Sequence, residues 1–331
     1  MATSILGPRD PLGRVDIVGA IRSLWRVHAP LTLTGLLMGV LTLFFIAGIF
    51  VDGRVITGAP AWLKPTKFGI SITLYTLTLT WMLGFVDRSS KWKRRAAAAV
   101  AWVAVVTFAI EMTAIVTQVV RGTTSHFNAA TPFDATVVAT MGITILVLWV
   151  ANFVTAILLL AQRFESRTFG WGLRLGLLLT IVGMGLGFLM TDPTAQQLAS
   201  WQGGEPITVI GAHSVGVPDG GEGMPVTGWS TEGGDLRIGH FVGMHALQVV
   251  PFVGWFLSRR RRLSPARSVP LTWIFAAAYA AIMLLLTWQA LRAQPLVAPD
   301  AVTAGAFLSI VLLAGSASLI ALRPRLRRQA G

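Results

Sequence analysis

The sequence predicts an all-α protein, a polytopic bundle of transmembrane helices. Of its 331 residues, 54% are hydrophobic and only 12% are charged, whereas soluble domains carry about 25% charged residues. Apolar runs of roughly 20 residues recur, each long enough to cross the hydrocarbon core as a helix. A membrane β-barrel is not favoured, because its strands would be runs of about 10 residues of alternating polarity.

The N-terminal segment, residues 1–30, precedes the first long apolar run and is expected in the cytoplasm. Within it, a helix over residues 15–28 would place Ile17, Ile21 and Trp25 on one face, with arginines beside that face. This pattern is typical of an amphipathic helix that lies in the membrane interface.

Eight apolar runs follow, and each is predicted to be a membrane span. They cover residues 31–51, 67–86, 96–120, 134–161, 172–191, 239–257, 270–291 and 301–322. In the second run, threonine and leucine alternate from Ser71 to Thr80, as they would in a strand. Because this alternation lies inside a longer apolar run, we still expect a helix.

These runs divide the chain into four parts beyond residue 30. Spans one to five occupy residues 31–191, an extracytoplasmic loop occupies 192–238, spans six to eight occupy 239–322, and a basic tail occupies 323–331. The loop is rich in glycine and acidic residues. A long loop of this kind is usually either functional or disordered, and its composition favours a compact, turn-rich cap over the outer face.

The basic residues, which give a net charge of +13, orient the chain. Most lie in the short segments on one side of the predicted spans, and those on the other side are Arg54, Lys64, Lys67, Arg121, Arg237 and Arg292. Cytoplasmic loops carry an excess of lysine and arginine. We therefore expect both termini in the cytoplasm and a location in the inner or plasma membrane. The expected partner is the lipid bilayer, not nucleic acid.

Span six carries the most informative polar residues. His240, His245 and Gln248 lie in its first turns, and Asp235 and Arg237 directly precede it. Ionisable groups at membrane depth are costly, so they indicate a functional site. Catalytic roles are predicted for Asp235, Arg237 and Gln248. The structural alternatives are an N-cap for the aspartate and a snorkelling contact with headgroups for the arginine.

Span three and the loop after it supply two further candidates, Glu111 and His126. Glu111 lies roughly 13 Å from the outer end of its span at 1.5 Å per residue. A carboxylate at that depth must be paired, hydrogen-bonded or protonated, so Glu111 is predicted to be a catalytic proton acceptor. His213, in the outer loop, is the weakest of the candidates.

Two site-based hypotheses follow. In the first, His240, His245 and His126 bind a cofactor, either haem or a transition metal, in a membrane oxidoreductase or electron carrier. The absence of cysteine excludes thiolate ligands. His240 and His245 are five residues, or about 140°, apart on a helix, whereas the His-Glu-x-x-His motif uses four. Further ligands must then come from other spans.

In the second hypothesis, Glu111, His245 and Arg237 relay protons or bind an anionic solute in a proton-coupled or anion transporter. The small-molecule or ion ligand would enter under the outer loop. A third reading is a non-catalytic assembly protein whose polar face docks a partner helix. The sequence leaves open whether the chain is an enzyme or a carrier, and it leaves the oligomeric state open.

Overall fold

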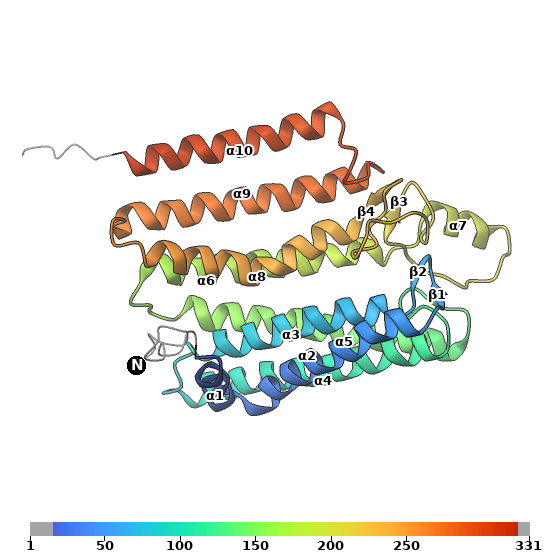
Figure 1. Ribbon diagram of the computed structural model, residues 1–331, viewed down its shortest axis with the longest axis horizontal. Coiled ribbons are helices and arrows are strands. Elements are labelled where there is room, and N and C mark those ends of the chain that lie inside the picture. The colour runs from blue at the N-terminus through green and yellow to red at the C-terminus, as the bar shows by residue number, and fades with distance from the viewer. Residues whose placement is uncertain (1–15, 324–331) are drawn as a thin grey trace, which may run out of the picture.

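The computed structural model describes residues 16–323, and these form an all-α bundle with almost no sheet (Figure 1). The α-helices are α1 (Ile17–Val27), α2 (Ala29–Val51), α3 (Leu63–Leu83), α4 (Lys91–Val120), α5 (Pro132–Leu160), α6 (Arg167–Gly185), α7 (Ala195–Gln202), α8 (Leu236–Ser258), α9 (Pro265–Leu291) and α10 (Ala301–Leu322). A 3₁₀ helix, η1 (Leu186–Met190), continues α6. Two short antiparallel pairs join β1 (Val55–Ile56) to β2 (Ala59–Pro60) and β3 (Ser214–Val215) to β4 (Gly234–Asp235).

Seven helices of the described chain are long and apolar enough to cross a membrane, as expected of a multi-pass membrane protein. Of the eight helices that contain a predicted span, α3 is not among these seven, because it contains two lysines and several threonines. It is nevertheless helical throughout Ser71–Thr80, as the sequence predicts, and the threonine hydroxyls find their partners within the helix. Thr76 Oγ1, for example, donates to Ile72 O at 2.7 Å. Such bonds satisfy the hydroxyl without a partner from another helix.

Four of the eight predicted spans, those at α2, α4, α8 and α9, are shorter than the helices that contain them. The α4, α6 and α9 helices each begin five residues before the predicted span, at Lys91, Arg167 and Pro265, and Pro270 lies inside α9. The predicted span 172–191 also runs past the end of α6 into η1. Hydropathy marks only the apolar part of a helix, and the polar first turns fall outside it. The outer loop also ends earlier than predicted, because Asp235 is the N-cap of α8. Residues 1–15 and 324–331 of the predicted N-terminal segment and basic tail lie outside the described residues.

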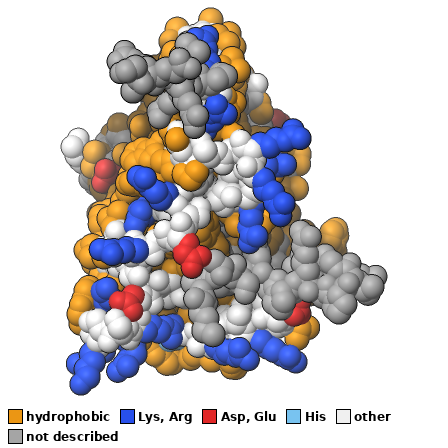
Figure 2. Space-filling view, turned by 90° about the vertical axis from the view of Figure 1, so that its left-hand side faces the viewer, with side chains coloured by type: hydrophobic (Ala, Val, Ile, Leu, Met, Phe, Trp, Pro, Cys, Tyr) orange, Lys and Arg blue, Asp and Glu red, His pale blue; other side chains and the backbone are white. Residues whose placement is uncertain are grey.

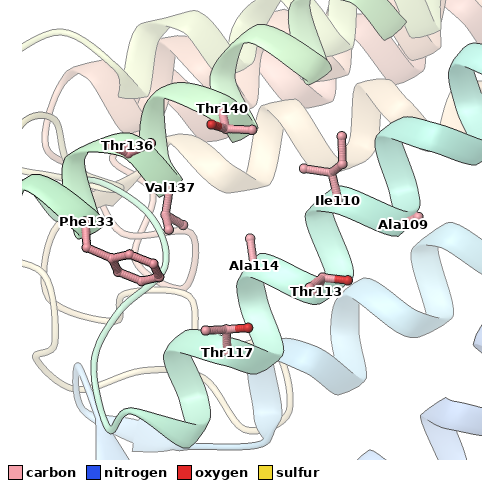
Figure 3. A pocket seen from close by; sticks show the side chains of 9 residues that line it. All are labelled: Ala109, Ile110, Thr113, Ala114, Thr117, Phe133, Thr136, Val137 and Thr140. Atoms are coloured by element: carbon pink, nitrogen blue, oxygen red, sulfur yellow. The ribbon is translucent and has the colours of Figure 1, made fainter.

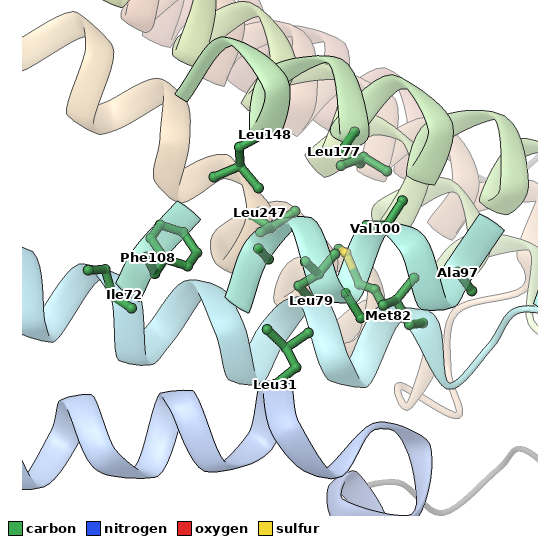
Figure 4. Packing of buried hydrophobic residues seen from close by; sticks show 14 of the residues in the cluster. Leu31, Ile72, Leu79, Met82, Ala97, Val100, Phe108, Leu148, Leu177 and Leu247 are labelled. Carbon is green, nitrogen blue, oxygen red and sulfur yellow. The ribbon is translucent and has the colours of Figure 1, made fainter. Parts of the chain in front are cut away.

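The helices form two groups, α1–α5 and α6 with α8–α10 (Figure 1). Buried leucines and methionines connect them, including Leu79 of α3, Leu177 of α6 and Leu247 of α8 (Figure 4). Within the second group, α6 and α8 touch through glycines. A Cβ on Gly183 would lie 2.3 Å from the Cα of Gly243, so only glycine allows this approach.

The two ends of the bundle differ in composition. At one end lie α7, the strand pairs and the connection between η1 and α8 (Figure 1). We call residues 191–235 the cap and this end the cap end. The opposite end, here the basic end, carries many lysine and arginine side chains and few carboxylates (Figure 2).

Candidate functional site

Asp235 lies at the N-terminus of α8, at the cap end of the candidate site. Its side chain is fully buried and accepts hydrogen bonds from the backbone N–H groups of Ser230 at 2.8 Å and Arg237 at 3.0 Å. The Arg237 guanidinium donates to both carboxylate oxygens and, through Nη2, to Gly228 O at 2.7 Å. Asp235 therefore acts as an N-cap and, with Arg237, ties the cap to α8. This geometry matches the structural alternative for Asp235, an N-cap, and not a catalytic role.

Two lysines from the first turns of α3 lie beneath the cap. Lys67 Nζ donates to Thr227 O at 2.8 Å. Lys64 has no hydrogen-bond or ion-pair partner within residues 16–323, yet it is half-buried. Its charge acts on Glu111, His126 and His213. Lys64 is thus a half-buried amino group without a hydrogen-bond or ion-pair partner in the described residues, within electrostatic range of carboxylate and imidazole groups from three segments.

His213 and Asp219 form a hydrogen-bonded pair inside the cap. His213 Nδ1 donates to Asp219 Oδ2 at 2.8 Å, and the same carboxylate accepts from the backbone N–H of His213 and Ser214. Burial lowers the pKa of His213, although Asp219 acts in the opposite direction. Burial works to raise the pKa of Asp219, but these hydrogen bonds outweigh it and leave that pKa well below its ordinary value. With Nδ1 held by the carboxylate, the other ring nitrogen is left to accept a proton.

His126 lies in the connection between α4 and α5, against aromatic rings. Its ring packs edge-on to Phe68 of α3, and Phe127 packs against His213 with ring centroids 4.8 Å apart. Burial, followed by the charge of Lys64, holds the pKa of His126 well below its ordinary value. His126 is therefore neutral at pH 7, and Phe127 lies between it and the His213–Asp219 pair.

Glu111 is deeply buried within the first helix group, with 1% of its surface exposed. Its nearest hydrogen-bond donor is Thr144 of α5, whose Oγ1 lies 3.4 Å from Oε1. Thr107, one turn away on α4, donates to the Thr144 carbonyl at 3.2 Å. No arginine or lysine forms an ion pair with Glu111 in the described chain. The carboxyl group is sheltered but only weakly bonded.

The two histidines of α8 bond to different partners. His240 Nδ1 donates to Gly183 O at 2.8 Å, near the junction of α6 and η1. His245 Nδ1 donates to Gln248 Oε1 at 3.2 Å, and Gln248 Nε2 reaches Thr78 Oγ1 of α3 at 3.2 Å. The Nε2 atom of His245 is buried without a partner. Gln248 therefore connects α8 to the other helix group, while His240 stays within its own.

The metal or haem hypothesis receives no support from this arrangement. Within residues 16–323, no three histidine, cysteine, aspartate or glutamate side chains are grouped so that they could hold a metal ion. The predicted ligand set of His126, His240 and His245 is divided among the α4–α5 connection, the α6–η1 junction and the contact of α8 with α3. The Nδ1 atom bonds to the Ser125 hydroxyl in His126, to a backbone carbonyl in His240 and to the Gln248 amide in His245.

Polar contacts continue toward the middle of the bundle. Tyr75 of α3 donates to Asn152 Oδ1 of α5 at 2.9 Å, and Asn152 Nδ2 donates to Leu148 O at 2.9 Å. The Tyr75 ring also packs edge-on against Phe108, one turn from Glu111. Tyr75 precedes Thr78 by one turn, so α3 carries polar groups from Lys64 to the Gln248 contact.

A separate hollow between α4 and α5 lies on the outside of the bundle. It is lined by Ala109, Ile110, Thr113, Ala114, Thr117, Phe133, Thr136, Val137 and Thr140 (Figure 3). The lining is mostly apolar and does not include Glu111, which is buried on another face of α4. This hollow lies on an exposed side of α4 and α5 and is not part of the polar site.

Sequence reasoning missed Lys64 and undervalued His213 with Asp219. The signal for Lys64 was its position at the start of the least apolar span, next to Lys67. The spacing of six residues between His213 and Asp219, across a glycine-rich turn, allows a carboxylate to reach an imidazole but does not require it. No family description, curated protein or solved structure matches this chain.

Proposed function

We propose that this chain is an eight-span carrier of the inner or plasma membrane that binds a small anionic solute beneath the cap and couples its movement to protons. With α3 counted as a span, the number of spans is even. The excess of lysine and arginine at the basic end then favours that end, with both termini, in the cytoplasm. The cap end and its binding site would face outward.

The observation that carries the proposal is Lys64. A half-buried ammonium without a counterion is unfavourable, and a bound anion would supply the missing charge. Lys67 and Arg237 lie close enough to add to the positive potential, but each already donates to a cap carbonyl. A carboxylate or phosphate group bound between Lys64 and the cap would complete the pairing.

The position of the polar groups supports a carrier. Lys64 and Glu111 belong to the first helix group, whereas Arg237 and His240 belong to the second. Many carriers bind their solute between two helix groups that rock against each other. The change from α6 to the 3₁₀ helix η1, with His240 bonded to Gly183 O, is an irregularity of the kind found at hinges.

Proton coupling is assigned to Glu111 and to the His213–Asp219 pair. Both can exchange a proton next to the Lys64 charge: the imidazole at the cap, the carboxyl deeper in the bundle. When an anion pairs with Lys64, no cation neutralises Glu111, and the sheltered carboxylate would bind a proton. When Lys64 is free of anion, its charge would favour the carboxylate, and Glu111 would release the proton. A redox function is not proposed, because the histidines bond to separate elements.

A binding measurement tests the proposal before any transport assay. The purified protein is heated with inorganic phosphate, acetate or succinate, and its melting temperature is compared with that in chloride. We expect at least one of these anions to stabilise the protein, and Lys64→Met to abolish the effect. Lys91→Met, which removes an exposed lysine at the basic end, is the matched control.

Uptake of the stabilising anion into proteoliposomes, with and without an inward proton gradient, then tests coupling. We expect Glu111→Gln to bind the anion but to lose the response to the gradient. If none of the three anions stabilises the protein, or if the Lys64→Met variant responds like the unsubstituted protein, the anion site is wrong.

A further inference from the structure

A second cavity, of about 620 Å³, lies at the basic end between the first turns of α9 and the last turns of α10. Its apolar lining, here called the floor, includes Pro270, Ala317 and the exposed Ile320, and its polar lining, here called the rim, includes Ser264, Arg267 and Arg323. No carboxylate lines it. We call it the α9–α10 notch. It is remote from Lys64, which lies at the cap end.

The polar groups of the notch are not used within the described protein. Neither Arg267 nor Arg323 takes part in any ion pair found in residues 16–323. Ser264 is the N-cap residue of α9, but its side chain makes no capping hydrogen bond. Two guanidinium groups and a hydroxyl therefore remain able to donate to one acceptor.

The α10 side of the notch is largely exposed, as expected of a helix that faces lipid. α10 packs mainly against α9, and Thr303, far from the notch, is its only buried residue. Ala317 lies six residues before Arg323, so the apolar floor reaches about 9 Å into the membrane at 1.5 Å per residue. Arginine forms bidentate pairs with phosphate, and basic pockets between spans on the cytoplasmic side bind anionic headgroups.

We propose that the α9–α10 notch binds an anionic phospholipid of the inner leaflet. Arg267 and Arg323 contact its phosphate, the Ser264 hydroxyl donates to the same group, and the first part of an acyl chain lies along Pro270, Ala317 and Ile320. A lipid without an amine fits best, because the rim offers two positive charges and no carboxylate to accept an ammonium group.

The test is lipid retention by the full chain, measured by native mass spectrometry after exchange into mixed micelles of phosphatidylglycerol and phosphatidylcholine. The unsubstituted protein is expected to retain phosphatidylglycerol preferentially. The double variant Arg267→Gln, Arg323→Gln is expected to bind it about tenfold more weakly, because charge-assisted contacts are lost. Arg94→Gln, Arg95→Gln removes the same charge from exposed arginines of α4 and is expected to retain the lipid.

A second variant tests the floor of the notch without changing charge. Ala317→Leu should fill the cavity and weaken retention, whereas Ser316→Leu, on the exposed side of α10, should not. Glycerol phosphate added to about 10 mM separates the sources of phosphate: a lipid site is not competed, and a soluble-phosphate site is. Equal loss in the α4 control, unchanged binding in Ala317→Leu, or competition by glycerol phosphate would overturn the proposal.

Discussion

The cap end and the basic end both carry positive charge, but they neutralise it differently. Of the five ion pairs that lysine or arginine forms in the described residues, four lie at the cap end and only Lys93–Asp87 lies at the basic end. At the cap end, arginines are held by carboxylates of the protein itself. At the basic end, arginines have no carboxylate partner in the described residues, although Arg88 and Arg174 donate to backbone carbonyls. Lys64 stands out because, in the described residues, it has neither the carboxylate partner of the cap-end arginines nor the carbonyl partner of Lys67.

The same difference predicts where a lost charge destabilises the fold. A buried pair is built into the structure, so removal of one member leaves the other charge uncompensated. An exposed arginine at the basic end is hydrated in the folded protein, so its substitution leaves no buried charge uncompensated. Three predictions follow this order of expected effect.

The largest effect is expected for Asp235→Ala. The substitution removes the N-cap of α8 and leaves the Arg237 guanidinium without its carboxylate. Breaking a buried pair typically costs about 3–5 kcal/mol, and loss of a cap adds about 1 kcal/mol. Unfolding in detergent, followed by tryptophan fluorescence, measures the change. Asp52→Ala, which breaks a more exposed cap-end pair with Arg54, is the control and should have a much smaller effect. Equal effects would mean that Asp235 is not the anchor of the cap.

The second prediction concerns acid. Burial lowers the pKa of His126 in the folded protein, whereas the unfolded chain binds a proton near pH 6.5. The stability that depends on neutral His126 is therefore complete above about pH 6.5 and falls as the pH drops below that value. The melting temperature should decrease between pH 7.5 and pH 5.5, and His126→Gln should reduce the decrease.

The basic end supplies the comparison for this experiment. Burial and the charge of Arg88 also lower the pKa of His28, which caps α2. His28→Gln should therefore reduce the acid effect too, but less than His126→Gln, because the pKa of His126 is lowered further. If the two variants behave alike, the cap end is not the more acid-sensitive part of the fold.

The helices could largely be predicted from the sequence, since a run of apolar residues must be helical to cross lipid. For α10 the predicted and observed bounds agree at Ala301 and Leu322, because Asp300 caps the first turn. For α9 they do not. The polar turn before Pro270 is helical, and a proline so near the helix start removes little hydrogen bonding.

The candidate site could be predicted only in part. Glu111 and the α8 histidines attract attention because polar residues are rare inside spans. His213 and Asp219 lie in a polar loop, where nothing in the local sequence distinguishes a paired histidine from a solvated one. The lack of a partner for Lys64 depends on the three-dimensional arrangement. Asp219 bonds to His213 and Asp235 bonds to Arg237, so neither carboxylate pairs with Lys64. Pairings between distant segments carry no periodic signal.

The smallest effect is expected for the double substitution Arg94→Gln, Arg95→Gln at the basic end. Both arginines are exposed in the first turn of α4 and have no ion-pair partner in the described residues. Surface substitutions of this kind usually change the free energy of unfolding by less than about 0.5 kcal/mol. Removing two positive charges near a helix N-terminus could even stabilise α4 slightly, because the helix dipole disfavours cations there. Unfolding in detergent should show little change. A large loss of stability in detergent would show that cations of the basic end are also held by the protein, and the contrast between the two ends would disappear.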